Sequence, residues 1–321
     1  MDLLRRIFWI LLLSSCLLQV LYSYFWAAWK HHYRHKHSTL SEVFEGTTHY
    51  DLLMLGTSRM QDHNNPRLID SITHWSSFNA GIDGGRLADM FLVLNGYLQQ
   101  HPAPRYVLLN VEKSWLASDS ADWLATRYVP YCHNRAVDSM FVAYKKYNIV
   151  QRYVPFTRIM LLDDHLKKTL LGAWWQPPEN NGSPWERYHN QIYHGYFENG
   201  IDSLATTHVP CAVPQTLKIT QTGVHLLEQW IQLCHQHNIG IIFTYTPEFH
   251  GVSKACYTNL PQIIDSIDSL AYVHNIPFLR YEADSMCYRA AYFTNFTHLN
   301  RHGARVYSER LGRDLVTILR E

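Results

Sequence analysis

The stretch YDLLMLGTSR, residues 50–59, decides the fold class of this chain. It opens with a short apolar run, and Gly56 then begins a polar turn that leads to Ser58. A brief apolar run that ends in a glycine turn is typical of a buried strand followed by a helix. Four similar runs follow along the chain: Ser77 to Ala80, Tyr106 to Val111, Ile239 to Tyr245 and Pro277 to Tyr281.

Amphipathic helices are expected between these runs. Apolar residues recur at three- and four-residue spacing in four segments: Arg86 to Gln100, Val224 to His237, Leu260 to His274 and Arg301 to Arg320. The alternation of strands and helices predicts an α/β fold with a doubly wound parallel sheet of about five strands. Ligands of such sheets bind beyond the carboxyl ends of the strands, so we expect the functional site there.

One long segment, at about residues 113–221, interrupts the alternation and is rich in aromatic residues and turn formers. We interpret it as a helical cap inserted over the carboxyl edge of the sheet. Its tryptophans are Trp115, Trp123, Trp174, Trp175 and Trp185. Such rings could stack on sugar rings, with Trp174 and Trp175 as substrate contacts, or they could simply pack on the insertion and the sheet.

Composition excludes some functions. The 28 basic and 27 acidic side chains leave a formal charge of +1, so the chain lacks the broad positive field that binds nucleic acid. The histidine-rich run at 31–37 is interpreted as part of a solvated collar, because nothing nearby fixes a metal-ligand spacing. We expect no metal and no other cofactor.

The N-terminus predicts a membrane segment. Residues 7–29 are almost uninterrupted apolar side chains, about the length that crosses a bilayer. Arg5 and Arg6 precede this run and place the N-terminus in the cytoplasm, although Lys30, Arg34 and Lys36 on the far side oppose that orientation. The expected order is a signal-anchor helix at 1–29, a juxtamembrane collar at 30–48 and an α/β domain at 49–321. That domain would lie on the periplasmic side of a bacterial cytoplasmic membrane.

Other interpretations of the same end remain open. Leu13-Ser14-Ser15-Cys16 is similar to a lipoprotein processing site, and a cleaved signal peptide is a further alternative. Each would export the domain. Cys132 and Cys211 could pair, whereas the absence of a CxxC motif gives no support to a zinc site.

Ser58 is the candidate nucleophile. It leaves the first strand where a helix begins, and the free N–H groups of a helix N-terminus can hold the negative charge of an acyl-transfer intermediate. Its other interpretation is a helix cap. Gly81, in FNAGIDGG at 78–85, could supply a second N–H to the same site or could serve only to make a turn.

His298 is the candidate base. It lies in NFTHLNRHGA, residues 295–304, just before the final helix, where it could face Ser58 across the sheet edge or be an ordinary surface residue.

In this order, GTSR, FNAGIDGG and NFTHLNRHGARVYSERL resemble the three motif blocks of the SGNH (GDSL-type) hydrolase superfamily. The likeness is greatest to its membrane-anchored, exported branch, which is related to alginate-acetylation and teichoic-acid D-alanylation proteins. The resemblance implies a flavodoxin-like sheet, a serine nucleophile, a histidine base, and oxyanion donors from the amides of the serine and glycine blocks, here Ser58 and Gly81.

Two departures from the family pattern affect the site. Asn295 stands where the family has an acidic residue, so the charged form of His298 would lack a carboxylate partner unless Asp284 or Glu282 replaced it. Asn110 is the candidate third oxyanion donor, although it could equally be an ordinary strand-end residue. Arg59 could bind an anionic part of the substrate or be solvated.

The function we expect is that of an exported serine acyl esterase or O-acyltransferase, which acts on cell-envelope or secreted polysaccharide through an acyl-serine intermediate. The alternative is a catalytically inactive envelope protein that binds glycan or assists a membrane-embedded acyltransferase, and Asn295 favours it.

Overall fold

The computed structural model describes residues 2–32, 34–117, 125–162, 194–205, 213–250 and 255–319. Four of the five tryptophans of the insertion (Trp123, Trp174, Trp175 and Trp185) lie outside the described residues, as does Cys211. The chain divides into two compact units. The first comprises Met1–Ser38 and Leu124–Ser183, and the second comprises Thr39–Trp123 and Pro184–Glu321.

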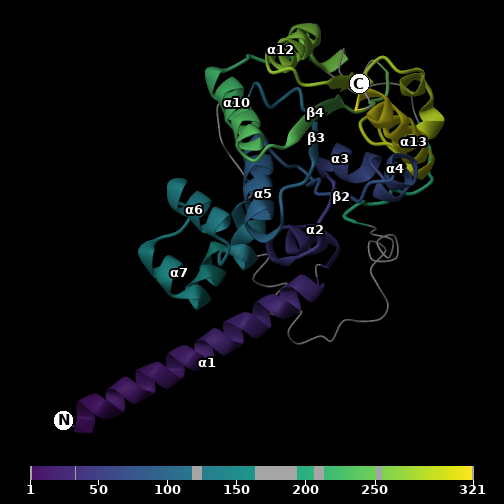
Figure 1. Cartoon of the computed structure of the whole chain (residues 1–321). Coiled ribbons are helices and arrows are strands. Elements are labelled where there is room, and N and C mark those ends of the chain that lie inside the picture. The colour runs from purple at the N-terminus through teal and green to yellow at the C-terminus, as the bar shows by residue number, and fades with distance from the viewer. Residues whose placement is uncertain are drawn as a thin grey trace. The chain divides into compact units, whose positions relative to one another are not determined.

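The second unit is built on a five-stranded parallel sheet, as the sequence predicts (Figure 1). Its strands are β1 (Leu52–Leu55), β2 (Ser77–Asn79), β3 (Tyr106–Asn110), β4 (Gly240–Tyr245) and β5 (Phe278–Arg280). Their spatial order is β2-β1-β3-β4-β5, the flavodoxin-like doubly wound order. All five expected strands are confirmed, with ends that differ by one or two residues.

Helices cover both faces of this sheet. The four predicted amphipathic helices form α5 (Leu87–Gln100), α10 (Gln221–Gln236), α12 (Leu260–Val273) and α13 (Arg301–Ile318). Two shorter helices, α3 (Ser58–His63) and α4 (Pro66–Thr73), follow β1. Helix α4 packs on α13, α5 packs on α10, and Figure 1 shows these two pairs on opposite sides of the sheet.

The core lies between the sheet and its helices. Side chains along β1, β3 and β4 are almost completely buried, in keeping with continuous apolar runs of a sheet that is covered on both faces. Tyr307 of α13 is also fully buried, and its hydroxyl lies 3.2 Å from Thr244 Oγ1 on β4. This contact joins the last helix to the centre of the sheet, close to the strand ends where the candidate site is expected.

Helix α2 (Arg34–Glu45) overlaps the segment that we interpreted as a solvated collar. Its Val43 and Phe44 are fully buried. A Cβ at Gly96 of α5 would lie 2.0 Å from the Phe44 ring, so only glycine permits this approach. Residues 39–48 of the expected collar therefore belong to the folded second unit.

The first unit contains α1 (Asp2–His32) and residues 125–162 of the insertion. Residues 2–27 of α1 are long and apolar enough to cross a membrane, a test that a signal sequence also passes. The insertion contributes η1 (Ala125–Tyr131), α6 (Arg135–Ala143), α7 (Ile149–Tyr153) and η2 (Pro155–Leu161). Cys132 is a buried free thiol, while its possible partner Cys211 lies outside the described residues.

Candidate active site

Ser58 is the first residue of α3, directly beyond the carboxyl end of β1. Thr57 caps the helix, and its hydroxyl accepts a hydrogen bond from the Arg59 N–H. A Cβ on Gly56 would lie 2.7 Å from the Met60 Cβ and 2.9 Å from the Asn110 Cβ, so the turn needs glycine. Helix capping was the other interpretation of Ser58, and the structure gives that role to Thr57 instead.

The structure brings Ser58 and His298 together. His298 Nε2 lies 2.8 Å from Ser58 Oγ, although the residues are 240 positions apart in the chain. His298 lies in the loop before α13, and the cap of that helix, Asn300, accepts from the Gly303 N–H. A serine hydroxyl at hydrogen-bonding distance from an imidazole is the arrangement that activates a nucleophile.

Asn295 orients the histidine through its side-chain oxygen. Asn295 Oδ1 lies 3.1 Å from His298 Nδ1, and it accepts from the backbone N–H groups of Thr297 and His298, both at 2.9 Å. Thr297 Oγ1 also lies 3.1 Å from His298 Nδ1. With Nδ1 donating to either oxygen, Nε2 is left to accept the proton of the Ser58 hydroxyl. An amide oxygen therefore occupies the position of the third group in a serine–histidine–acid triad.

Neither proposed substitute acid partners the ring. Asp284 caps η3 (Ser285–Tyr288) and forms an ion pair with Arg310. Glu282 pairs with Arg280 at 2.6 Å. The expectation that one of these carboxylates could lie beneath His298 is wrong, because both are bound to arginines elsewhere.

Burial and charge favour the neutral form of His298. Burial is the main cause that lowers the pKa of its ring below the ordinary value, and the positive charge of Arg59 adds to this effect. Carboxylates of Asp83, Glu112 and Glu248 oppose it. The ring is therefore unprotonated near neutral pH and able to accept a proton.

Two of the expected oxyanion donors are engaged elsewhere. The Gly81 N–H donates to Asn79 Oδ1 at 3.0 Å, and Gly81 itself packs against the backbone of Gln61. Asn110 is fully buried, where its amide donates to Glu112 and accepts from the Thr246 N–H. The predictions for Gly81 and Asn110 are therefore wrong.

The cavity at the site is lined by residues that could serve as oxyanion donors in place of Gly81 and Asn110. It has a volume of about 390 Å³ and is lined by Ser58 and His298 together with Gly84, Ser114 and Trp115. Gly84 has φ +63°, the left-handed conformation that favours glycine. Within the described residues, neither the Ser58 N–H nor the Gly84 N–H makes a hydrogen bond. The glycine block does line the site, but through Gly84 and not through the predicted Gly81.

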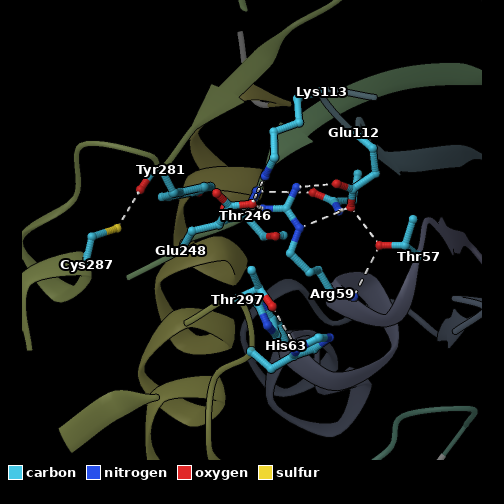
Figure 2. A network of polar contacts seen from close by, with 12 residues as sticks. Thr57, Arg59, His63, Glu112, Lys113, Thr246, Glu248, Tyr281, Cys287 and Thr297 are labelled. Atoms are coloured by element: carbon cyan, nitrogen blue, oxygen red, sulfur yellow. Dashed lines mark hydrogen bonds and ion pairs between the residues drawn. The ribbon is translucent and has the colours of Figure 1, made fainter. Parts of the chain in front are cut away.

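Arg59 does not face a substrate. Its side chain is almost fully buried and lies between the carboxylates of Glu112 and Glu248, with Nη2 2.6 Å from Glu112 Oε2 and Nη1 2.7 Å from Glu248 Oε1 (Figure 2). Lys113 Nζ contacts the same Glu248 oxygen, Oε1, at 2.6 Å. The prediction of Arg59 as an anion-binding residue is therefore wrong. Arg86 also lines the cavity, is exposed, and has no ion-pair partner among the described residues.

His63, whose role is not evident from the sequence pattern, supports the loop of the candidate base. It is fully buried, and its Nε2 accepts from the Leu299 N–H at 3.0 Å. Its ring stands edge-on to that of His298, with 6.0 Å between the centroids. Burial lowers the pKa of His63, which keeps Nε2 free to accept. Only its position five residues after Ser58 could have indicated this role.

Trp115 is buried, as the packing interpretation predicts, and it also lines the cavity. Across the described residues, no group of three or more His, Cys, Asp and Glu side chains could hold a metal ion.

The fold and the site together define an α/β unit that carries a serine–histidine–asparagine set at the carboxyl edge of a parallel sheet. No protein-family model matches the sequence, and no curated protein matches it. Similar solved structures are those of GDSL-type lipases and acylhydrolases. A GDSL-like lipase from Bacteroides thetaiotaomicron has a TM-score of 0.40 and 9% identity, covering 84% of this chain and 88% of its own.

A lipase/acylhydrolase from Enterococcus faecalis has a TM-score of 0.36 and 10% identity, covering 83% of this chain and 95% of its own. These similarities concern the fold alone.

Proposed function

We propose that this chain is a serine acyl esterase or O-acyltransferase in which Ser58 is the nucleophile and His298 the base. The observation that carries the proposal is the 2.8 Å contact between Ser58 Oγ and His298 Nε2 at the wall of an open cavity. A hydroxyl that only capped a helix would need no imidazole partner, and Thr57 already fulfils that role.

The reaction begins with attack of Ser58 Oγ on the carbonyl carbon of an ester, while the hydroxyl proton moves to His298 Nε2. The N–H groups of Ser58 and Gly84 hold the oxyanion. The protonated His298 then gives its proton to the leaving alcohol as the bond to that alcohol breaks. Water or a sugar hydroxyl, deprotonated by His298, attacks the acyl-serine and regenerates Ser58.

We further propose that the acyl group is removed from, or transferred to, a cell-envelope or secreted polysaccharide. The support is the apolar helix α1, which would hold the catalytic unit at a membrane on the extracytoplasmic side. The open cavity, which has both apolar and polar walls, would suit a sugar ester.

The second candidate is an inactive relative that binds glycan or assists a membrane acyltransferase. The observation that favours it is the amide of Asn295, which stabilises a charged imidazole less than a carboxylate would. In that case the serine–histidine contact would be retained without turnover.

Labelling of the detergent-solubilised full chain with a fluorophosphonate probe tests the proposal. Hydrolysis of 4-nitrophenyl acetate is measured in parallel for the wild type, Ser58→Ala and His298→Ala. Ser269→Ala, at an exposed serine of α12, is the matched control. We expect both signals to vanish in the two site variants and to persist in the control. An unreactive wild-type Ser58 would favour the inactive candidate.

A further inference from the structure

Glu112 holds the two residues that flank the candidate nucleophile. Its Oε1 accepts from the Thr57 hydroxyl at 2.6 Å and from Arg59 Nε at 3.1 Å. Its Oε2 accepts from Arg59 Nη2 at 2.6 Å. Among the described residues, no hydrogen bond joins Glu112 to Ser58, the residue between Thr57 and Arg59. One carboxylate therefore fixes the chain immediately before and immediately after Ser58.

Glu112 is itself immobilised at the sheet edge. It follows β3 by two residues and is mostly buried, and Asn110 at the end of that strand donates to Glu112 Oε1 at 3.0 Å. The amide of Asn110, which is not an oxyanion donor, thus has a role in holding this carboxylate. The carboxylate has at least one donor on each oxygen, and such charge-assisted bonds are about twice as strong as neutral ones.

The far end of Arg59 extends the network to β4. Arg59 Nη1 contacts Glu248 Oε1 at 2.7 Å and the Thr246 carbonyl at 3.3 Å. With Lys113 on Glu248, the cluster contains two cations and two carboxylates, and Figure 2 shows Arg59 in its centre. A balanced, hydrogen-bonded cluster of this kind is tolerated in a buried place where a single charge would not be.

We propose that Glu112 is a positioning residue for Ser58: through Thr57 and Arg59 it fixes the start of α3, and it offsets the charge of Arg59 beside His298. This inference rests on the proposed function. The loss of Glu112 would free the turn that carries Ser58 and leave Arg59 with one carboxylate partner fewer.

The charges of the cluster supply a signature that a purely structural role lacks. The charge of Arg59 lowers the pKa of His298, whereas Glu112 and Glu248 raise it. Removal of the Glu112 charge should lower the pKa of His298, and removal of the Arg59 charge should raise it. Because the neutral ring is the active form, the acidic limb of the pH–rate profile should move down in the first case and up in the second.

The test compares Glu112→Gln, Glu112→Asp and Arg59→Gln in the full chain, with 4-nitrophenyl acetate as the probe. Glu112→Gln retains the shape but turns an amide N–H toward Arg59 Nη2. We expect kcat to fall about 100-fold, the loss typical of a reacting group displaced by about 1 Å, with KM little changed. Glu112→Asp should return the acidic limb toward its wild-type pH without restoring kcat.

Asp284→Asn is the matched control, since it removes a carboxylate from an arginine outside the cavity lining. It should change neither kcat nor the limb. If single variants at the cluster fail to fold, the double variant Arg59→Gln/Glu112→Gln is used instead. It removes both charges of the ion pair, so neither is left without the other. It should still show the fall in kcat.

Wild-type kcat and an unmoved limb in Glu112→Gln would overturn the inference while Ser58 remained reactive. A wild type with no Ser58-dependent activity would instead overturn the proposed function. In that case, NMR titration of the His298 ring in Glu112→Gln would still test the charge effect, with a lowered pKa expected and an unchanged pKa contradicting it.

Discussion

Replacing Asn295 by aspartate should turn the histidine into a stronger base. Asn295 Oδ1 accepts from His298 Nδ1 at 3.1 Å, and no hydrogen bond from the Asn295 amide nitrogen is present among the described residues. Aspartate can keep each of the accepted bonds, so the substitution adds a charge without the loss of a donor. The expected change is therefore almost purely electrostatic.

Its magnitude follows from the exposure of the site. Two unit charges about 4 Å apart interact by about 1 kcal/mol in water and about 4 kcal/mol at the effective dielectric near a protein surface. Because Asn295 is exposed, we take the lower value. It corresponds to a rise of roughly 0.7 in the pKa of His298 and to about a fivefold gain in kcat, if the same energy stabilises the imidazolium in the transition state.

The assay is the pH dependence of ester hydrolysis by the full chain. The acidic limb of the wild type should lie below pH 6.5, because the pKa of His298 is lowered from that value. In Asn295→Asp the limb should move upward and the plateau should rise. A limb and a plateau that both stay at their wild-type values would refute the assignment of His298 as the base oriented by residue 295.

Three further outcomes are expected. Burial raises the pKa of Asp62 to about 8, so the folded state retains a proton that the unfolded chain loses near pH 4, and stability should fall as pH rises between these values. Asp62→Asn should remove that slope in urea unfolding, and an unchanged slope would contradict it. Gly81→Ala should destabilise the protein by about 1 to 3 kcal/mol in the same assay, since its Cβ would lie 2.5 Å from the Gln61 backbone nitrogen; unchanged stability would show that the backbone yields. Arg86→Gln should lower kcat/KM about two- to fivefold for an acetylated polyuronate but not for an acetylated neutral glucan, as befits an exposed cation; equal effects on both polymers would exclude a charge contact.

The sheet could be predicted from the sequence because its signals are local. Each strand is a short apolar run between breakers, and the helices carry regular apolar stripes. Helix α4 went unrecognised because it spans only eight residues between Asn65 and His74, too short for a clear stripe. Its burial against α13 depends on contacts that the local pattern does not contain.

The nucleophile and the base could be located from the ends of elements, whereas the supporting residues could not. Arg59 resembles a solvated arginine when only its neighbours are considered. Its carboxylate partners lie 53 and 189 positions away, at the ends of two other strands. The local sequence likewise cannot distinguish Gly81 from Gly84 as an oxyanion donor. Only the fold shows that the Gly81 N–H already donates to Asn79 Oδ1.

The separation of 240 positions between Ser58 and His298 also matters during synthesis. The hydroxyl leaves the ribosome well before its imidazole, because the chain between the two residues must be made first. A fragment that ends before residue 298 would carry the serine but no base. Chains that stop short of His298 would consequently be inert toward esters, and reactivity would arise only after both residues had been made.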